Sequence, residues 1–197
     1  MSILTAQLPY EDRHGNEIYT DFRNMLRIWE IFGNPEYNPA EQWVRAMTRM
    51  YGNIEELETP HDLLADELHW FFAGGDLEES TGRGRSKAPL YDFDEDADYF
   101  VGAFYQVYGI DLTSEDTQLH WWLFLALFRS LPEDTQLTKR IYYRGVDTSK
   151  MKGDMKREYE QMKKDVALKR KKKSINRPTQ SLRERLLARQ EEIKAEA

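Results

Sequence analysis

The chain has 197 residues, of which 40% are apolar and 13% aromatic, a composition that favours one folded domain with room for an extension. It contains no cysteine, which excludes disulfides, thiol nucleophiles and zinc–thiolate sites. The net charge is −7, but residues 151–197 hold 15 Lys or Arg against 8 Asp or Glu, a net of +7, which leaves 13 against 27 in residues 1–150, a net of −14.

This charge division predicts that the basic C-terminal part meets something acidic, whether a protein partner, a nucleic acid or a neighbouring subunit. The N-terminus lacks a signal-peptide pattern, and no apolar run has the length of a membrane span. We therefore expect a soluble intracellular protein.

The first 20 residues are expected to be extended, with a small β-hairpin turning at Gly15-Asn16. Asp21 then caps a helix that Gly33 ends, and Asn38 caps a second helix with Pro39 in its first turn. A third helix starts from Thr59-Pro60-His61-Asp62. Apolar residues at helical spacing predict the buried face of each helix. These are Phe22, Met25, Leu26, Trp29 and Phe32 in the first helix, Trp43, Met47, Met50 and Tyr51 in the second, and Leu64, Leu68, Phe71 and Phe72 in the third.

Residues 74–90 are rich in glycine, serine and basic residues and are interpreted as a flexible surface loop. A fourth helix is expected to open at Asp92-Phe93-Asp94-Glu95 and to close at Gly109. Its predicted buried face includes Phe100 and Phe104.

Residues 119–128 are apolar except for His120, and they predict a helix over residues 114–130 that is buried at the centre of the protein. The sequence thus predicts a mainly α protein, a compact bundle of about six helices around this central helix. The structural core is expected to contain Trp121, Trp122, Phe124, Phe128, Phe100, Phe104, Trp29 and Phe71.

A short helix carrying Leu137 and Ile141 follows and ends near Gly145. From Gly153 the pattern changes to a narrow apolar seam among charged residues, which is typical of a helix that packs by one edge or awaits a partner. We expect residues 1–152 to form the helical domain and residues 153–197 a charged helical extension. The candidate partner-binding residues are Met155, Tyr159, Met162 and Val166, followed by Lys169, Arg170, Lys171, Lys172 and Lys173.

Two acidic groups resemble metal sites, but each lacks part of the required pattern. The run from Asp92 to Asp98 lacks the glycine and the final glutamate of a calcium loop. His61, Asp62, Asp66 and His69 lie in one helix, with no second repeat to complete a ligand set. We therefore expect no metal and no cofactor.

No catalytic constellation is predicted either. Residues 82–87 lack the glycine spacing of a phosphate loop, and no nucleophile elbow is present. A single histidine in an apolar helix, as His120 is, is usually a core residue hydrogen-bonded to a neighbour. The basic tail is a candidate for nucleic-acid binding, but no aromatic residue interleaves its cluster and the body is acidic. We expect the protein not to be an enzyme.

Several stretches resemble one family, the gene-product-fifteen tail proteins of siphophages that infect Gram-positive bacteria. The resemblance covers roughly residues 18–165 and excludes the basic tail. Its matching segments are Thr20-Asp21-Phe22-Arg23, Tyr91-Asp92-Phe93, Tyr108-Gly109-Ile110-Asp111-Leu112, Leu119-His120-Trp121-Trp122, Ala126-Leu127-Phe128, Leu131-Pro132-Glu133-Asp134-Thr135, Tyr143-Arg144 and Asp147-Thr148-Ser149-Lys150-Met151-Lys152.

This resemblance implies a tail assembly chaperone of a bacteriophage, acting in virion morphogenesis through protein–protein interaction. The implied partners are the tape-measure protein and the major tail protein or an upstream chaperone gene product, in the host cell cytoplasm and absent from the mature virion. The alternatives are a structural tail component that stays in the virion and a nucleic-acid-binding protein that uses the basic tail. The sequence leaves the oligomeric state open and predicts no membrane association.

Overall fold

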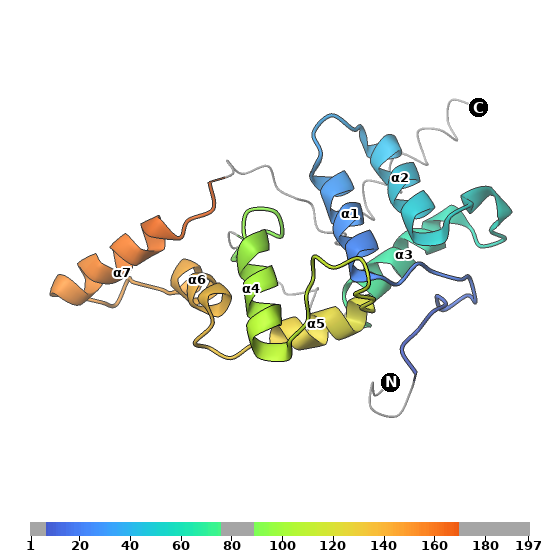
Figure 1. The fold of residues 1–197 in the computed structure, drawn as a ribbon. Coiled ribbons are helices and arrows are strands. Elements are labelled where there is room, and N and C mark those ends of the chain that lie inside the picture. Colours follow the sequence, from blue (N-terminus) through green and yellow to red (C-terminus); the bar gives the residue numbers. More distant parts are fainter. Residues whose placement is uncertain (1–6, 76–88, 170–197) are drawn as a thin grey trace. The chain divides into compact units, whose positions relative to one another are not determined.

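The computed structural model describes residues 7–75 and 89–169, and within them it contains seven α-helices, one 3-10 helix and no β-strand. The predicted mainly α fold is therefore confirmed (Figure 1). Within the described residues, no helix is both long and apolar enough to span a membrane. The elements are α1 Phe22–Gly33, α2 Pro39–Tyr51, η1 Ile54–Glu56, α3 His61–Phe72, α4 Ala97–Tyr108, α5 Trp121–Arg129, α6 Gln136–Gly145 and α7 Gly153–Asp165.

The chain divides into two compact units. Of the described residues, 7–75 and 119–125 belong to the first unit, and 89–118 and 126–169 belong to the second. The predicted boundary between residues 1–152 and 153–197 remains a prediction.

The first unit contains α1, α2 and α3, whose starts follow local capping chemistry. Asp21 accepts a hydrogen bond from the Arg23 amide at the start of α1, as predicted. Asn38 and Glu41 form a reciprocal capping box at the start of α2. No side chain caps α3, which begins after Pro60. The apolar stripes of the three helices are buried against one another: Phe22, Met25, Ile28, Trp29, Phe32, Ala46, Met47, Met50, Tyr51, Leu64, Ala65, Leu68 and Phe71.

The N-terminal segment of this unit forms a tight turn instead of the predicted β-hairpin. A single bridge joins Glu11 and Glu17, and Gly15 supplies the positive φ of 85° that the turn requires. The carboxylate of Asp12, which is buried, accepts hydrogen bonds from the His14 and Asn16 amides and from the Tyr51 hydroxyl. Burial raises the pKa of Asp12, but these hydrogen bonds outweigh it and the pKa is lowered. The side chain therefore organises the turn where strand pairing was expected.

The predicted helix over residues 114–130 is wrong at its start, because α5 begins at Trp121. Asp111 accepts hydrogen bonds from the amide and hydroxyl of Thr113, and the Thr117 hydroxyl donates to the Asp111 carbonyl. These side chains hold the backbone in turns, the usual competition between short polar residues and a helix. The backbone at Leu119–Trp121 instead pairs with residues 20–22.

Both indoles at the start of α5 bind the end of α3. The Trp121 Nε1 group donates to the Phe72 carbonyl at 3.1 Å, and the Trp122 Nε1 group donates to the Phe71 carbonyl at 2.9 Å. Trp121 is fully buried, whereas Trp122 is half-buried and its ring lies against Gly75. The two indole N–H groups thus provide hydrogen-bond donors for carbonyls at the end of α3, while their rings pack within the first unit.

The second unit contains α4, α6, α7 and residues 126–129 of α5. Aromatic rings from the segment before α4, from α4 and from α5 form its core, with Tyr91 5.0 Å from Phe128 and Phe93 5.0 Å from Phe100 between ring centroids. The predicted start of α4 at Asp92 is wrong, because the Asp92 carboxylate accepts from the Asp94 and Glu95 amides in a turn, and the helix begins at Ala97. The predicted loop at residues 74–90 lies mostly outside the described residues.

The residues predicted to form the core differ in burial. Trp121, Phe124, Phe100, Phe104, Trp29 and Phe71 are buried. Trp122 and Phe128 are half-buried, and Leu123 of α5 is exposed. Helix α5 therefore has apolar residues on all its faces, but not all of these faces are buried.

Candidate partner-binding surface on helix α7

Helix α7 carries the apolar seam that the sequence singled out. Met155 is 60% exposed, and Tyr159, Met162 and Val166 are half-buried. None of the residues of α7 is fully buried. Lys169 is exposed, and Arg170, Lys171, Lys172 and Lys173 lie outside the described residues.

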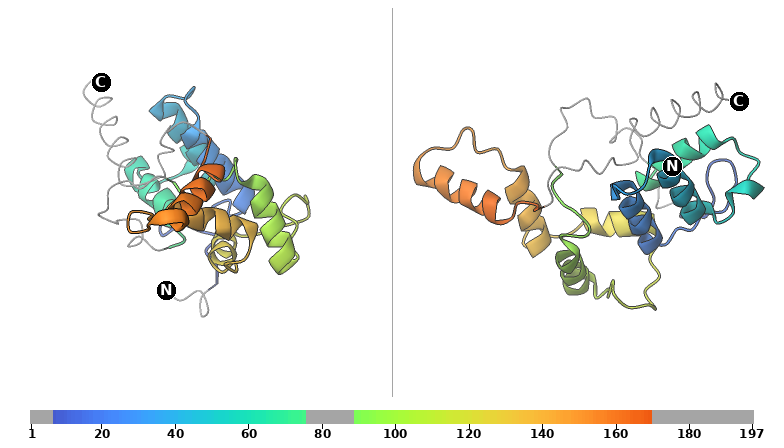
Figure 2. Two further views of the ribbon diagram at one scale, coloured as in Figure 1. Left: turned by 90° about the vertical axis from the view of Figure 1, so that its left-hand side faces the viewer. Right: turned by 90° about the horizontal axis from the view of Figure 1, so that it is seen from above.

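One edge of α7 packs on α6. Figure 2 shows α6 in amber and α7 in orange, joined by a short loop. The rings of Tyr159 and Tyr143 lie 5.8 Å apart between centroids. The neighbouring Tyr142 side chain is the main cause of the raised pKa of Tyr159. Further along the same edge, the Lys163 ammonium group donates to the Val146 carbonyl at 2.8 Å.

The opposite edge of the seam faces solvent. At 100° per residue, Asp154, Glu158, Gln161 and Asp165 fall on one side of the seam, and all four are exposed. Lys156, Glu160 and Lys163 fall on the other side and are half-buried. The seam therefore lies between a packed edge and an open, mainly acidic edge.

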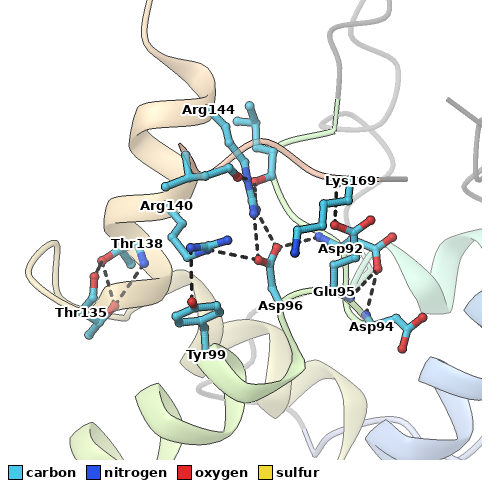
Figure 3. Close-up of polar contacts among 12 residues, drawn as sticks. Asp92, Asp94, Glu95, Asp96, Tyr99, Thr135, Thr138, Arg140, Arg144 and Lys169 are labelled. Atoms are coloured by element: carbon cyan, nitrogen blue, oxygen red, sulfur yellow. Dashed lines mark hydrogen bonds and ion pairs between the residues drawn. The ribbon is translucent and has the colours of Figure 1, made fainter. Parts of the chain in front are cut away.

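A buried ion pair fixes the C-terminal end of α7 (Figure 3). The Arg144 guanidinium binds the Asp96 carboxylate through two hydrogen bonds of 2.6 and 2.9 Å, and it also donates to the Leu90 and Val166 carbonyls. Arg144 is 5% exposed and Asp96 is fully buried. One side chain of α6 thereby joins the segment before α4, the start of α4 and the end of α7.

Asp96 remains charged in this setting. Burial raises its pKa, but the hydrogen bonds from Arg144 and the Asp92 amide and the charges of Arg144 and Arg140 outweigh burial and lower it. The Nε group of Arg140 lies 3.4 Å from Asp96, and its guanidinium stacks 4.2 Å above the Tyr99 ring. Just beyond α7, the Lys169 amide donates to the Glu95 carboxylate at 2.7 Å.

The sequence did not predict this cluster, although a signal for it was present. Arg140 and Arg144 follow Leu137 by three and seven residues, so they share the face of α6 that carries its buried leucine. Two arginines on a buried face require an acidic partner on a neighbouring element. The acidic run at the start of α4 supplies that partner.

His120 and His61, two of the residues considered for chemistry, have structural contacts. His120 is buried, its Nε2 atom lies 2.9 Å from the Pro9 carbonyl, and its Nδ1 atom accepts from the Trp122 amide. Since that amide only donates, Nε2 carries the proton. Burial lowers the pKa of His120 although the Pro9 contact raises it. The His61 ring lies 4.9 Å from Trp43, and no group of three or more potential ligands is placed to hold a metal within the described residues.

Comparison with known proteins identifies the family. A family model described as Bacteriophage Gp15 protein matches residues 4–168, which is most of the chain. The chain matches no curated protein and no solved structure. The family match confirms the resemblance predicted from the sequence, while the type of host remains a prediction. The chain therefore belongs to the bacteriophage Gp15 protein family.

Proposed function

We propose that this phage protein is a tail assembly chaperone that binds the tape-measure protein, with the tail-tube protein as a further partner. The observation that carries the proposal is the apolar seam of α7, which begins at the 60% exposed Met155 and runs through Met162 to Val166. Family membership supports a role in a phage, and the seam supports a role in binding.

The seam has the chemistry that a long helical partner needs. A tape-measure protein is expected to be a very long helix with apolar stripes, which aggregates unless the stripes are covered. A row of apolar residues spaced four, three and four apart matches such a stripe, and methionine adapts to irregular partners. The charged residues on both sides of the seam keep the carrier soluble before it binds.

The proposed binding must be reversible, because tube subunits have to replace the chaperone as they polymerise. One helix face of this width buries less surface than a permanent interface does, which favours a transient complex. The protein on this account is not an enzyme, acts in the host cytoplasm and is absent from the finished virion.

The test is co-expression with the tape-measure protein encoded by the same phage. The wild-type chain should raise the soluble yield of that protein and co-purify with it. Met155→Glu combined with Met162→Glu should abolish both effects, since two charges in the seam oppose burial. The matched control, Arg157→Glu with Lys164→Glu, changes the exposed opposite face and should leave both effects intact.

Unchanged solubility with no co-purification would contradict the proposal. Mass spectrometry of purified particles tests the alternative of a structural tail component, because a chaperone should be missing from them. A stoichiometric amount of this protein in the particles would replace the chaperone assignment with a structural one.

A further inference from the structure

The seam of α7 is open along one edge only. Helix α6 packs against the other edge, where the 55% exposed Tyr142 continues the apolar surface. The Tyr143 ring lies between it and α7, with centroids 5.4 Å from Tyr142 and 5.8 Å from Tyr159. The open edge is exposed along its whole length and consists of Asp154, Glu158, Gln161 and Asp165. A helix that lies on the seam therefore places one of its own edges against these four side chains.

The open edge carries charge of one sign. The Asp154 carboxylate lies 3.3 Å from the Arg157 guanidinium, but these side chains are 98% and 83% exposed, so water screens the pair. The Asp165 carboxylate accepts a hydrogen bond of 2.8 Å from Gln161, which is neutral and leaves the charge in place. Over the ~16 Å from position 154 to position 165, an incoming helix thus meets an apolar row bordered by carboxylates.

We propose that the seam accepts an amphipathic helix of a partner protein whose apolar stripe is bordered on one side by lysine or arginine residues, which pair with Asp154, Glu158 and Asp165. The apolar residues supply most of the contact area, while the charges discriminate between partners and fix the register. Basic residues that recur every three to four positions along the partner face the open edge. The identification of this partner with the tape-measure protein rests on the proposed function, whereas the preference for a basic border does not.

A second copy of this chain fits the seam less well than such a helix does. An antiparallel pair of α7 helices would place the two open edges opposite each other, and their carboxylates would repel. A parallel pair would place each open edge against the packed edge of the other copy, where α6 already lies. The charges and the position of α6 therefore favour a different protein as the occupant.

The test uses the full-length protein and two synthetic helical peptides that share one leucine stripe. One peptide carries lysine along a border of the stripe, the other carries glutamate at the same positions, and fluorescence anisotropy measures the binding of each. The protein should bind the lysine-bordered peptide ~10-fold more tightly. This difference should shrink between ~0.1 M and ~1 M salt, as the screening length falls from about 10 Å to about 3 Å. Met155→Ala with Met162→Ala should weaken the binding of both peptides.

A charge reversal at the open edge makes the test specific. Glu158→Lys with Asp165→Lys should reverse the preference, so that the glutamate-bordered peptide binds more tightly. Misfolding does not produce this result, because an unfolded variant loses the binding of both peptides. The matched control, Glu55→Lys with Glu58→Lys, changes the net charge equally at exposed positions of the first unit and should keep the preference for lysine.

Equal binding of the two peptides by the wild type would overturn the proposal. So would a preference for lysine that survives the charge reversal at Glu158 and Asp165, or one that the control at Glu55 and Glu58 reverses as well. The last two results would assign the preference to the net charge of the chain and not to the open edge of α7.

The same variants separate this inference from the proposed function. If both hold, Glu158→Lys with Asp165→Lys should co-purify with less tape-measure protein than the wild type or the control does. Co-purification that resists this variant but is abolished by Met155→Glu with Met162→Glu would refute the basic border and retain the chaperone function. A peptide preference that reverses as expected, without any binding of the tape-measure protein, would retain the basic border and refute the chaperone function.

Discussion

Replacement of Arg144 by methionine should destabilise the second unit strongly. The variant keeps most of the side-chain volume but removes two charge-assisted hydrogen bonds to Asp96 and the donors to the Leu90 and Val166 carbonyls. Breaking a buried ion pair at one partner costs about 3–5 kcal/mol, because the remaining charge stays buried. Arg140 lies 3.4 Å from the carboxylate and compensates in part, so we expect a loss of about 3 kcal/mol.

Urea unfolding followed by circular dichroism measures this loss, which corresponds to a midpoint lowered by about 1–2 M. Asp96→Asn supplies the second arm of a double-mutant cycle, and the double variant should cost at least ~1 kcal/mol less than the sum of the single variants. The matched control is Arg157→Met, whose ion pair with Asp154 is 83% and 98% exposed, and its midpoint should not move. A shift for Arg144→Met as small as that of the control would refute this reasoning.

Three further variants test contacts in the first unit, each by urea unfolding monitored through tryptophan fluorescence. Burial holds the folded-state pKa of His120 below its ordinary 6.5, so the unfolded chain takes up a proton first as the pH falls. The contribution of His120 to the free energy of unfolding should therefore be constant above pH 6.5 and decrease below it. His120→Gln should remove this decrease. Arg13→Ala removes the guanidinium that pairs with the 1% exposed Glu67 and should cost about 1–3 kcal/mol. We expect the lower end of this range, because the Arg13 amide still donates to Glu67 and the His14 Nε2 atom remains 3.5 Å from it. A cost below that of a surface alanine variant would contradict this assignment. Gly75→Ala adds a Cβ atom 2.7 Å from the Trp122 ring at a φ of 86° and should cost at least ~1 kcal/mol, whereas a neutral result would show that the ring does not lie there.

Local signals predicted much of the helical structure. The cap at Asp21 and the start at Pro39 with Asn38 before it agree with the structure. Each depends on residues within one helical turn, where side-chain capping and proline geometry decide the backbone. Apolar spacing likewise identified most of the buried stripes of α1, α2 and α3, although Leu26, Trp43 and Phe72 are half-buried.

The errors arose where short polar residues had two ways to hydrogen-bond. Asp92 and Ser114 both looked like helix starts, but the Asp92 carboxylate holds a turn, and the Asp111 carboxylate holds the turn that precedes Ser114. The choice between these outcomes depends on contacts distant in sequence, such as the pairing of the Leu119 and Trp121 backbone with residues 20–22. Periodicity within one window does not contain that information.

The candidate site was predicted in part for a similar reason. Spacing alone placed Met155, Tyr159, Met162 and Val166 on one stripe of α7. The anchor formed by Arg144 and Asp96 joins residues 48 positions apart, so it depends on how α4 and α6 pack. The sequence thus indicated which face of α7 is apolar, but not what fixes the end of that helix.

Hydrogen exchange of the complex with the tape-measure protein tests the central claim most directly. The account predicts that the amides of Gly153–Asp165 become protected when the complex forms, and that Met155→Glu with Met162→Glu prevents both the complex and the protection. A complex that forms normally while exchange in α7 stays unchanged would contradict the claim that this seam is the binding surface.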